Sequence, residues 1–177
     1  TKKYSTSFSS AIGLLHRDLR APIFNIYGFV RLADEIVDTF HDYDKSLLLQ
    51  EFKKDTWDAI QRGISLNPIL HSFQMTVNQY QIDLKLIDAF FHSMEMDLSK
   101  KVYNNAEYGE YIYGSAEVVG LMCLKVFCEG KEDICQQLKS SAKSLGAAFQ
   151  KVNFLRDMKA DQEGLSRLYF PGCDFDN

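Results

Sequence analysis

Apolar residues recur at intervals of three and four positions along almost the whole 177-residue chain, and no segment alternates apolar and polar residues as a strand would. This spacing predicts an all-α fold of packed antiparallel helices that enclose polar faces. Capping and breaking residues then place the helix ends. The first three predicted helices run from Pro22, which suits a first helical turn, to about Phe40, from Asp44 to Gly63, and from Asn67 to about Tyr80. The next helix is capped by Asp83 and runs through Met94, and another runs from Asn104 or Asn105 to Phe127. Residues 131–160 form one further helix or two.

The composition is that of a protein with a substantial core, since 46% of the residues are hydrophobic and 13% are aromatic. The three prolines all lie at predicted helix ends and no low-complexity linker interrupts the chain, so we expect residues 1–177 to form a single helical domain. A formal net charge of −4 offers no basic surface for nucleic acid, which we therefore exclude as a partner.

The cysteines and the longest apolar run argue against a zinc site, a disulfide framework and a membrane-spanning helix. The four cysteines form no Cys-x-x-Cys pair and share no zinc-site spacing with histidine, so neither a zinc site nor a disulfide framework is predicted. The longest apolar run, Val118–Cys128, is interrupted by Lys125 and is too short to cross a bilayer. Reduced thiols and a cytoplasmic location are the simplest interpretation.

Asp34 and Asp38 form the first of two aspartate pairs, and both lie on the first long predicted helix. Tyr27, Arg31, Asp34 and Asp38 are spaced so that they fall within an arc of about 60°, as one polar stripe. The stripe has two interpretations. It is either a solvated face with an ion pair from Arg31 to Asp34 or Glu35, or half of a site in which neighbouring carboxylates hold Mg²⁺ and a diphosphate.

The second pair, Asp157 and Asp161, lies at the end of the last predicted helix and favours the metal interpretation. The stripe that contains it is narrow and is flanked by Phe149 and Phe154, while Arg156 is expected to project elsewhere. Carboxylates set into an apolar wall need cations. The other members of this stripe are Gly146, Gln150 and Asn153. Two such helices that face each other would hold several Mg²⁺ ions for a polyphosphate substrate to bridge.

Two further features stay open from the local sequence alone. Arg167 and Tyr169, in the segment Gly164–Pro171, are either a flap with a phosphate-binding guanidinium or an exposed arginine beside a packed tyrosine. Tyr111 on the long predicted helix has the pattern of a core aromatic residue.

Four blocks of residues, taken together and in this order, resemble the squalene and phytoene synthase family along nearly the whole chain. They are Tyr27-x-x-x-Arg31-x-x-Asp34-Glu35-Ile36-Val37-Asp38, Met94-Glu95-Met96-Asp97-Leu98, Val119-Gly120-Leu121-Met122, and Gln150-x-x-Asn153-Phe154-Leu155-Arg156-Asp157-x-x-x-Asp161. The resemblance implies an isoprenoid-synthase fold, an antiparallel helical bundle around a central cavity. It also implies a Mg²⁺-dependent transferase of isoprenoid biosynthesis that joins two prenyl diphosphates head to head through a cyclopropyl diphosphate intermediate.

The second and third blocks resemble the phytoene synthase branch, which implies geranylgeranyl diphosphate as substrate and a place in carotenoid biosynthesis. One alternative is a squalene- or dehydrosqualene-type synthase that uses farnesyl diphosphate, with NADPH as a cofactor only for the squalene type. Another alternative, from a different class, is a non-catalytic family member that serves as an assembly or scaffold protein. The apolar substrates are compatible with peripheral membrane contact.

The same resemblance implies roles for individual residues. Metal ligation falls to Asp34, Asp38, Asp157 and Asp161, with Asn153 in support. The residues expected near the diphosphates are Ser5, Ser7, Arg31, Arg156, Arg167 and Tyr169, and those expected to line the reaction cavity are Phe8, Tyr27, Tyr111 and Gln150. Tyr111, Arg156, Asp34 and Asp38 are the residues expected to act most directly in catalysis.

This chain also departs from the family pattern. Glu35 stands where a second aspartate is usual, Tyr4 where histidine is frequent, and Glu117 where glycine is common. Family members generally continue for several more helices. We therefore expect a fragment whose bundle is incomplete at its C-terminal end, which puts its own activity in doubt and exposes apolar surface that favours a homo-oligomer.

Overall fold

The computed structural model describes residues 6–100 and 102–160, and among them the secondary structure is helical with no β-strand, which confirms the all-α prediction. No helix in this part of the chain is both long and apolar enough to span a bilayer. The elements are α1 (Thr6–Gly13), α2 (Arg17–Asp38), α3 (Lys45–Arg62), α4 (Pro68–Tyr80), α5 (Leu84–Ser99), α6 (Asn105–Ile112), the π-helical turn η1 (Tyr113–Glu117), α7 (Val118–Phe127) and α8 (Glu132–Ala160).

Side-chain caps begin four of these helices where the sequence predicts them. Asp44, Asp83 and Asn104 each accept a hydrogen bond from a first-turn backbone N–H at 3.0 Å, and Asn67 caps α4 in the same way. Gly63 ends α3 in the left-handed conformation, with φ of 70°, which glycine adopts without strain. Local hydrogen bonding therefore fixes most of the helix ends.

The first long helix differs from its prediction because it begins at Arg17 and not at Pro22. Pro22 lies inside α2, where it lacks the N–H that would bond to the carbonyl of Asp18. The proline is buried together with Ile23 and Ile26. Packing of this apolar face against the bundle offsets the missing hydrogen bond, which the local sequence does not show.

Two other differences concern helix number. The chain from residue 105 to 127 is not one regular α-helix, because the π-helical turn η1 interrupts it. The short helix α1 was not predicted. Residues 132–160 form the single helix α8, which is one of the two predicted alternatives.

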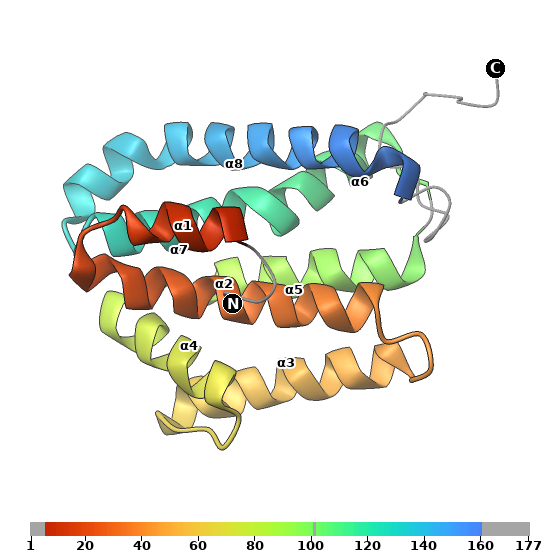
Figure 1. Cartoon of the computed structure of the whole chain (residues 1–177), viewed down its shortest axis with the longest axis horizontal. Coiled ribbons are helices and arrows are strands. Elements are labelled where there is room, and N and C mark those ends of the chain that lie inside the picture. Colours follow the sequence, from red (N-terminus) through yellow and green to blue (C-terminus); the bar gives the residue numbers. More distant parts are fainter. Residues whose placement is uncertain (1–5, 101, 161–177) are drawn as a thin grey trace.

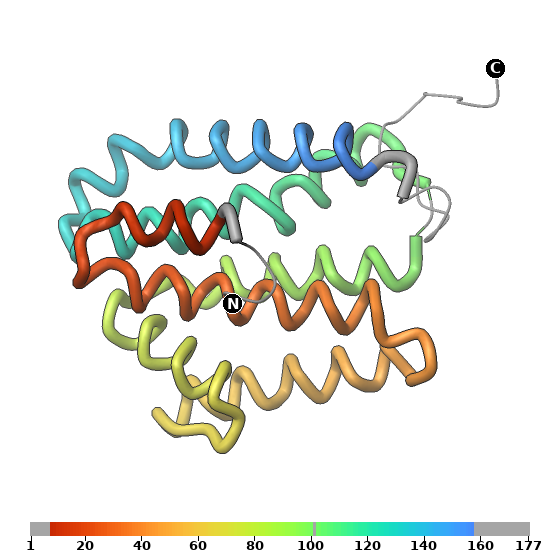
Figure 2. The backbone as a smooth tube through the Cα atoms, viewed as in Figure 1, coloured from red at the N-terminus to blue at the C-terminus, as the bar shows by residue number. Residues whose placement is uncertain are grey.

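The long helices α2, α3, α5 and α8 lie along a common long axis, as Figure 1 shows, with α8 along one edge of the bundle and α3 along the other, whereas α4 is inclined to them. The colour order in Figure 2 shows that α2, α5 and α8 run toward the same end of the bundle, whereas α3 and α7 run back. The C-terminal halves of α2, α5 and α8 therefore lie at one end of the molecule.

Phe29 of α2 lies at the centre of an aromatic cluster to which four helices contribute. Its ring stacks on Phe73 of α4 with centroids 3.9 Å apart and planes 2° apart. The rings of Phe52, Phe90 and Phe91 lie 5.6, 5.3 and 5.6 Å from it. Aromatic pairs at these separations contribute beyond their burial, so this cluster fixes α2 against α3, α4 and α5.

Glycines allow η1 and α7 to lie unusually close to their neighbours. A Cβ at Gly114 would lie 2.5 Å from a carbonyl oxygen of α5, and a Cβ at Gly120 would lie 2.9 Å from one of α8. A Cβ at Gly146 of α8 would lie 2.7 Å from a carbonyl oxygen of η1. The contacts between η1 and α5, and between η1, α7 and α8, thus require residues without side chains.

We predict that Gly114→Ala destabilises the fold by about 1–3 kcal/mol, because the new methyl group must push α5 away from η1. Gly109→Ala is the matched control, since Gly109 is exposed in α6 with no atom within 4 Å of an added Cβ, and it should be neutral or stabilising by up to about 1 kcal/mol. Urea unfolding followed by circular dichroism measures both. Equal stability of Gly114→Ala and the unsubstituted chain would contradict the close contact.

Candidate functional site

Asp34 carries the most perturbed carboxyl group at the C-terminal half of α2. Its pKa is raised from 3.8 to about 7, first because burial disfavours the charged form and then because Asp38 lies close by. The Arg31 guanidinium opposes the rise, whereas the charges of Asp97 and Glu35 add to it. Asp34 therefore faces more negative charge than its surroundings compensate, and a cation would relieve it.

Arg31 makes the ion pair that the simpler interpretation of the stripe proposed, with Glu35 one turn further along α2. Glu35 also accepts a hydrogen bond from the Thr39 hydroxyl at 2.8 Å. Nevertheless, the Nε of Arg31 is buried and has no hydrogen-bond partner in the described residues. A buried guanidinium N–H without an acceptor is a donor that an anionic ligand can satisfy.

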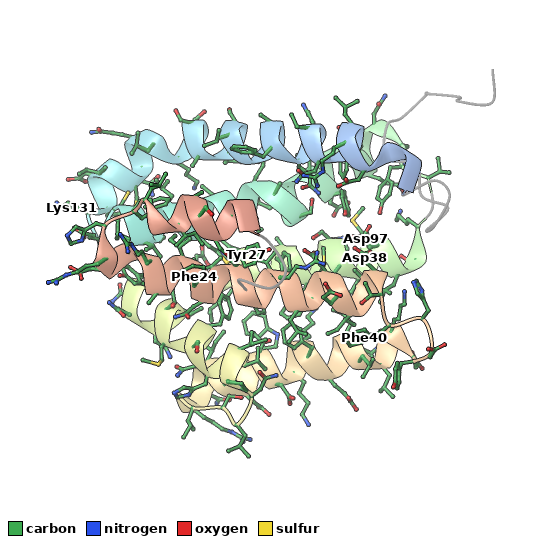
Figure 3. All side chains as sticks on the ribbon, viewed as in Figure 1. Phe24, Tyr27, Asp38, Phe40, Asp97 and Lys131 are labelled. Carbon is green, nitrogen blue, oxygen red and sulfur yellow. The ribbon has the colours of Figure 1, made fainter. Side chains whose placement is uncertain are left out.

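Asp97, on the C-terminal half of α5, joins this acidic group. Its side chain is only 7% exposed, and its two oxygens accept hydrogen bonds from the hydroxyls of Tyr111 at 2.7 Å and Tyr103 at 3.2 Å. Figure 3 labels Asp97 on α5 and Asp38 on α2, both at the same end of the bundle. The carboxyl group of Asp97 is close enough to Asp34 to raise its pKa.

Asp97 was not predicted to have a role, although the sequence around it carries a signal. Phe90, Met94 and Asp97 follow the three- and four-residue spacing of the buried face of α5, so an acid occupies a core position. Tyr103 gave no comparable signal, because it lies in the connection between α5 and α6.

Tyr111 connects this group to α8. Its ring centroid lies 5.1 Å from that of Tyr103 and 5.9 Å from that of Phe154 on α8. Tyr108 of α6 packs on the same Phe154 ring at 6.2 Å. These side chains form a small core cluster beside the carboxylates, and they link α5, α6 and α8 at the acidic end of the bundle.

On α8, Asn153 and Gln150 are half-buried and joined by a hydrogen bond of 3.5 Å. Asp157 differs from its prediction. The guanidinium of Arg156 binds it at 2.8 and 2.5 Å and lowers its pKa, and its side chain is 43% exposed. The expectations that Arg156 projects away and that Asp157 sits in an apolar wall are wrong here, because the long arginine side chain curls back onto its neighbour.

The remaining predicted site residues divide into two groups. Phe8 of α1 stacks on Tyr27 of α2 with centroids 4.3 Å apart, which places α1 over the N-terminal part of the stripe. Tyr27 and Arg31 also line a pocket of about 260 Å³ with Phe40 and Ile69. The residues that lie outside the described part of the chain, or whose side chains do, are Ser5, Ser7, Asp161, Arg167 and Tyr169.

Some of these groups could hold a metal ion, but only together with ligands from another molecule. Among the described residues, no three acidic, histidine or cysteine side chains are close enough to hold a metal ion together. Mg²⁺, however, is usually held by one or two carboxylates and by the oxygens of a bound phosphate group. Asp34 and Asp38 can supply the carboxylates, and the unpaired Nε of Arg31 can receive the anion.

Comparison with known proteins identifies what the chain is similar to. The family model for squalene/phytoene synthase matches residues 1–177. A presqualene diphosphate synthase from Rhodopseudomonas palustris is 27% identical over 168 residues, which cover 94% of this chain and 58% of that protein. A phytoene synthase from Arthrospira platensis is 28% identical over 181 residues, which cover 97% of this chain and 58% of that protein.

Among solved structures, a squalene synthase from Alicyclobacillus acidocaldarius superposes with a TM-score of 0.83 at 22% identity, over 97% of this chain and 63% of that one. This likeness confirms the isoprenoid-synthase fold. The chain spans somewhat under two thirds of the length of each protein named.

We predict that Asp34→Asn stabilises the fold near neutral pH. Since the pKa is raised to about 7, the folded chain holds a proton there more tightly than the unfolded chain, and stability is lost as the pH rises from about 4 to 7. Asparagine removes this loss, so the variant should gain up to about 4 kcal/mol at pH 7.5 and almost nothing at pH 4. Unfolding by urea without divalent cations measures the difference.

Asp42→Asn is the control for Asp34→Asn, because Asp42 is exposed in the turn after α2. It should leave the dependence of stability on pH unchanged. A gain for Asp34→Asn that is equal at both pH values would show that the carboxyl group is not crowded as described.

Proposed function

We propose that this chain, which belongs to the squalene/phytoene synthase family over residues 1–177, forms the catalytic part of a prenyltransferase that joins two prenyl diphosphates head to head. The observation that carries the proposal is the crowded carboxyl group of Asp34, beside Asp38 and Asp97. Such a site needs cations, and a diphosphate with bound Mg²⁺ would supply them. The relatives named above are longer than this chain, so the activity is proposed for the whole protein.

The binding of the diphosphate would use groups from two helices. Asp34 and Asp38 of α2 and Asp157 of α8 would hold Mg²⁺, and the same role is predicted for Asp161, which lies outside the described residues. When bound, Mg²⁺ would stabilise the negative charge that develops on the departing diphosphate. The buried Nε of Arg31 would donate to a diphosphate oxygen, and Asn153 would support the ligands on α8.

The hydrocarbon part of the reaction requires a dry, electron-rich wall. Loss of diphosphate leaves an allylic carbocation, which water would quench. Tyr111, Phe154 and Tyr108 present adjoining aromatic rings beside the carboxylates. Aromatic faces exclude water and favour positive charge, so these rings suit the path from two prenyl chains to a cyclopropyl diphosphate.

For the substrate we propose geranylgeranyl diphosphate, with phytoene as product and carotenoid biosynthesis as the process. The Met94–Leu98 and Val119–Met122 blocks favour this branch. The alternative is a squalene- or dehydrosqualene-type synthase with farnesyl diphosphate, and with NADPH for the squalene type. Its specific support is the similarity to a presqualene diphosphate synthase, which is as strong as the similarity to a phytoene synthase.

A non-catalytic scaffold remains the alternative from another class. It has no need of two carboxylate pairs, so the presence of Asp34, Asp38 and Asp157 argues against it.

We also propose that copies associate, since the outer side of α8 exposes Leu145, Phe149, Val152 and Leu155, each about 60% accessible. Contact with a membrane surface, where such substrates would reside, and a cytoplasmic location stay predictions.

Incubating the full-length protein with Mg²⁺ and either the C15 or the C20 diphosphate, then identifying the hydrocarbon by mass spectrometry, tests the function. We expect consumption of the C20 substrate and a C40 product, and no turnover after chelation of divalent cations. A C30 product made only from the C15 substrate would move the protein to the alternative branch.

We predict that Asp38→Asn lowers kcat/KM by at least about 100-fold, because it removes one ligand of the cation that stabilises the departing diphosphate. Asp55→Asn on the exposed side of α3 is the matched control and should retain full activity.

Calorimetric titration of the protein with a non-hydrolysable prenyl thiolodiphosphate distinguishes an enzyme from a scaffold, since a scaffold should show no Mg²⁺-dependent binding.

A further inference from the structure

The carboxyl group of Asp97 is buried among apolar side chains of α5, with the carboxyl group of Asp34 nearby. It lies at 7% exposure on the face of α5 that also buries Phe90, Met94 and Met96. A carboxylate in such a place is costly unless donors surround it. The donors that the structure provides include two phenols, those of Tyr103 and Tyr111, one for each carboxylate oxygen.

Tyr103 has a fixed position, although it lies in the connection between α5 and α6 and not in a helix. It is 1% exposed, and it directly precedes Asn104, whose side chain caps α6. Glu107 completes the capping box by accepting from the backbone N–H of Asn104, and Lys100 binds the same glutamate. Interactions of Lys100 and Asn104 with Glu107 therefore hold the connection from α5 to α6, and this places the Tyr103 hydroxyl beside Asp97.

Tyr111 is oriented by the same carboxylate. At 2.7 Å its hydroxyl makes the shorter of the two bonds to Asp97, and its ring packs between those of Tyr103 and Phe154. A phenol has one proton to donate and keeps lone pairs that can accept. With its proton directed at Asp97, the Tyr111 oxygen presents electron density, and not a proton, to its other neighbours.

We propose that Asp97 is a positioning residue that orients the phenol of Tyr111 toward the reacting prenyl chains, and that Tyr103 in turn holds Asp97 in place. The inference rests on the proposed function. Asp97 acts through Tyr111 and is not itself a ligand of Mg²⁺. The oriented phenol oxygen then faces an allylic cation as an electron-pair donor, a role for which a hydroxyl that donates toward the substrate would be unsuited.

The kinetic test uses the full-length protein and a double-mutant cycle. Asp97→Asn should lower kcat by about 100-fold and Tyr103→Phe by about 5-fold, with KM and the Mg²⁺ concentration for half-maximal rate changed by less than about 2-fold, as expected for the loss of charged and neutral hydrogen bonds. In a Tyr111→Phe background, Asp97→Asn should cost little more, because the two residues act as one unit.

Tyr43→Phe is the control, since the Tyr43 side chain is 69% exposed in the turn after α2 and has no part in the proposed site, and it should keep wild-type kcat. Losses that multiply in the double variant would show that Asp97 acts independently of Tyr111 and would overturn the inference. A rise in the Mg²⁺ requirement of Asp97→Asn would also overturn it, because that result identifies a metal ligand.

A spectroscopic test separates this inference from the proposed function. With ¹³Cζ-tyrosine incorporated into the protein, Asp97→Asn should shift the resonances of Tyr103 and Tyr111 and leave that of Tyr108 in place. If the unsubstituted protein makes no prenyl product, the proposed function fails, while these shifts still report whether the pair of phenols is bound to Asp97. Unshifted Tyr103 and Tyr111 resonances would contradict the arrangement itself.

Discussion

Negative charge inside an apolar bundle is the constraint on which the acidic end of this molecule depends. The burial of Asp97 is tolerated because the hydroxyls of Tyr103 and Tyr111 each donate a hydrogen bond to one of its carboxylate oxygens. Asp34 is less well compensated, because burial and nearby carboxyl groups raise its pKa to about 7. The two acids therefore differ in their surroundings, since Asp97 accepts hydrogen bonds from two phenols whereas Asp34 lies near other carboxyl groups and would be stabilised by a cation.

The direction of the helices strengthens this preference for cations. α2, α5 and α8 run the same way, as Figure 1 shows, and Asp38, Asp97 and Asp157 each lie in the last turn of one of them. Carboxylates are disfavoured at helix C-termini, where the helix dipole already contributes negative potential. Three helices that all carry an acid at this unfavourable position create a strongly electronegative end, which suits a divalent ion and opposes binding of a bare diphosphate.

Much of the fold could be predicted because its signals are local. Caps such as Asp44, Asn67 and Asp83 act within one turn, and the spacing of Asp34 and Asp38 is enough to place both on one face. The interior position of Pro22 was missed because tertiary burial outweighs the preference of a single residue. The partnership of Asp97 with Tyr103 was missed because it joins a helix to a connection, and the pairing of Arg156 with Asp157 depends on how a flexible side chain settles.

The π-helical turn η1 has a consequence for the phase of the helix that contains it. A regular α-helix rotates about 100° per residue, so the nine steps from Tyr111 to Gly120 would set them about 180° apart. One residue taken up by the wider turn reduces the separation to about 80°. Both residues can then meet α8, where Tyr111 contacts Phe154 and Gly120 lies against Ala142. A regular α-helix through all nine steps would keep the same hydrophobic content and yet turn the tyrosine by about 100° away from its partners.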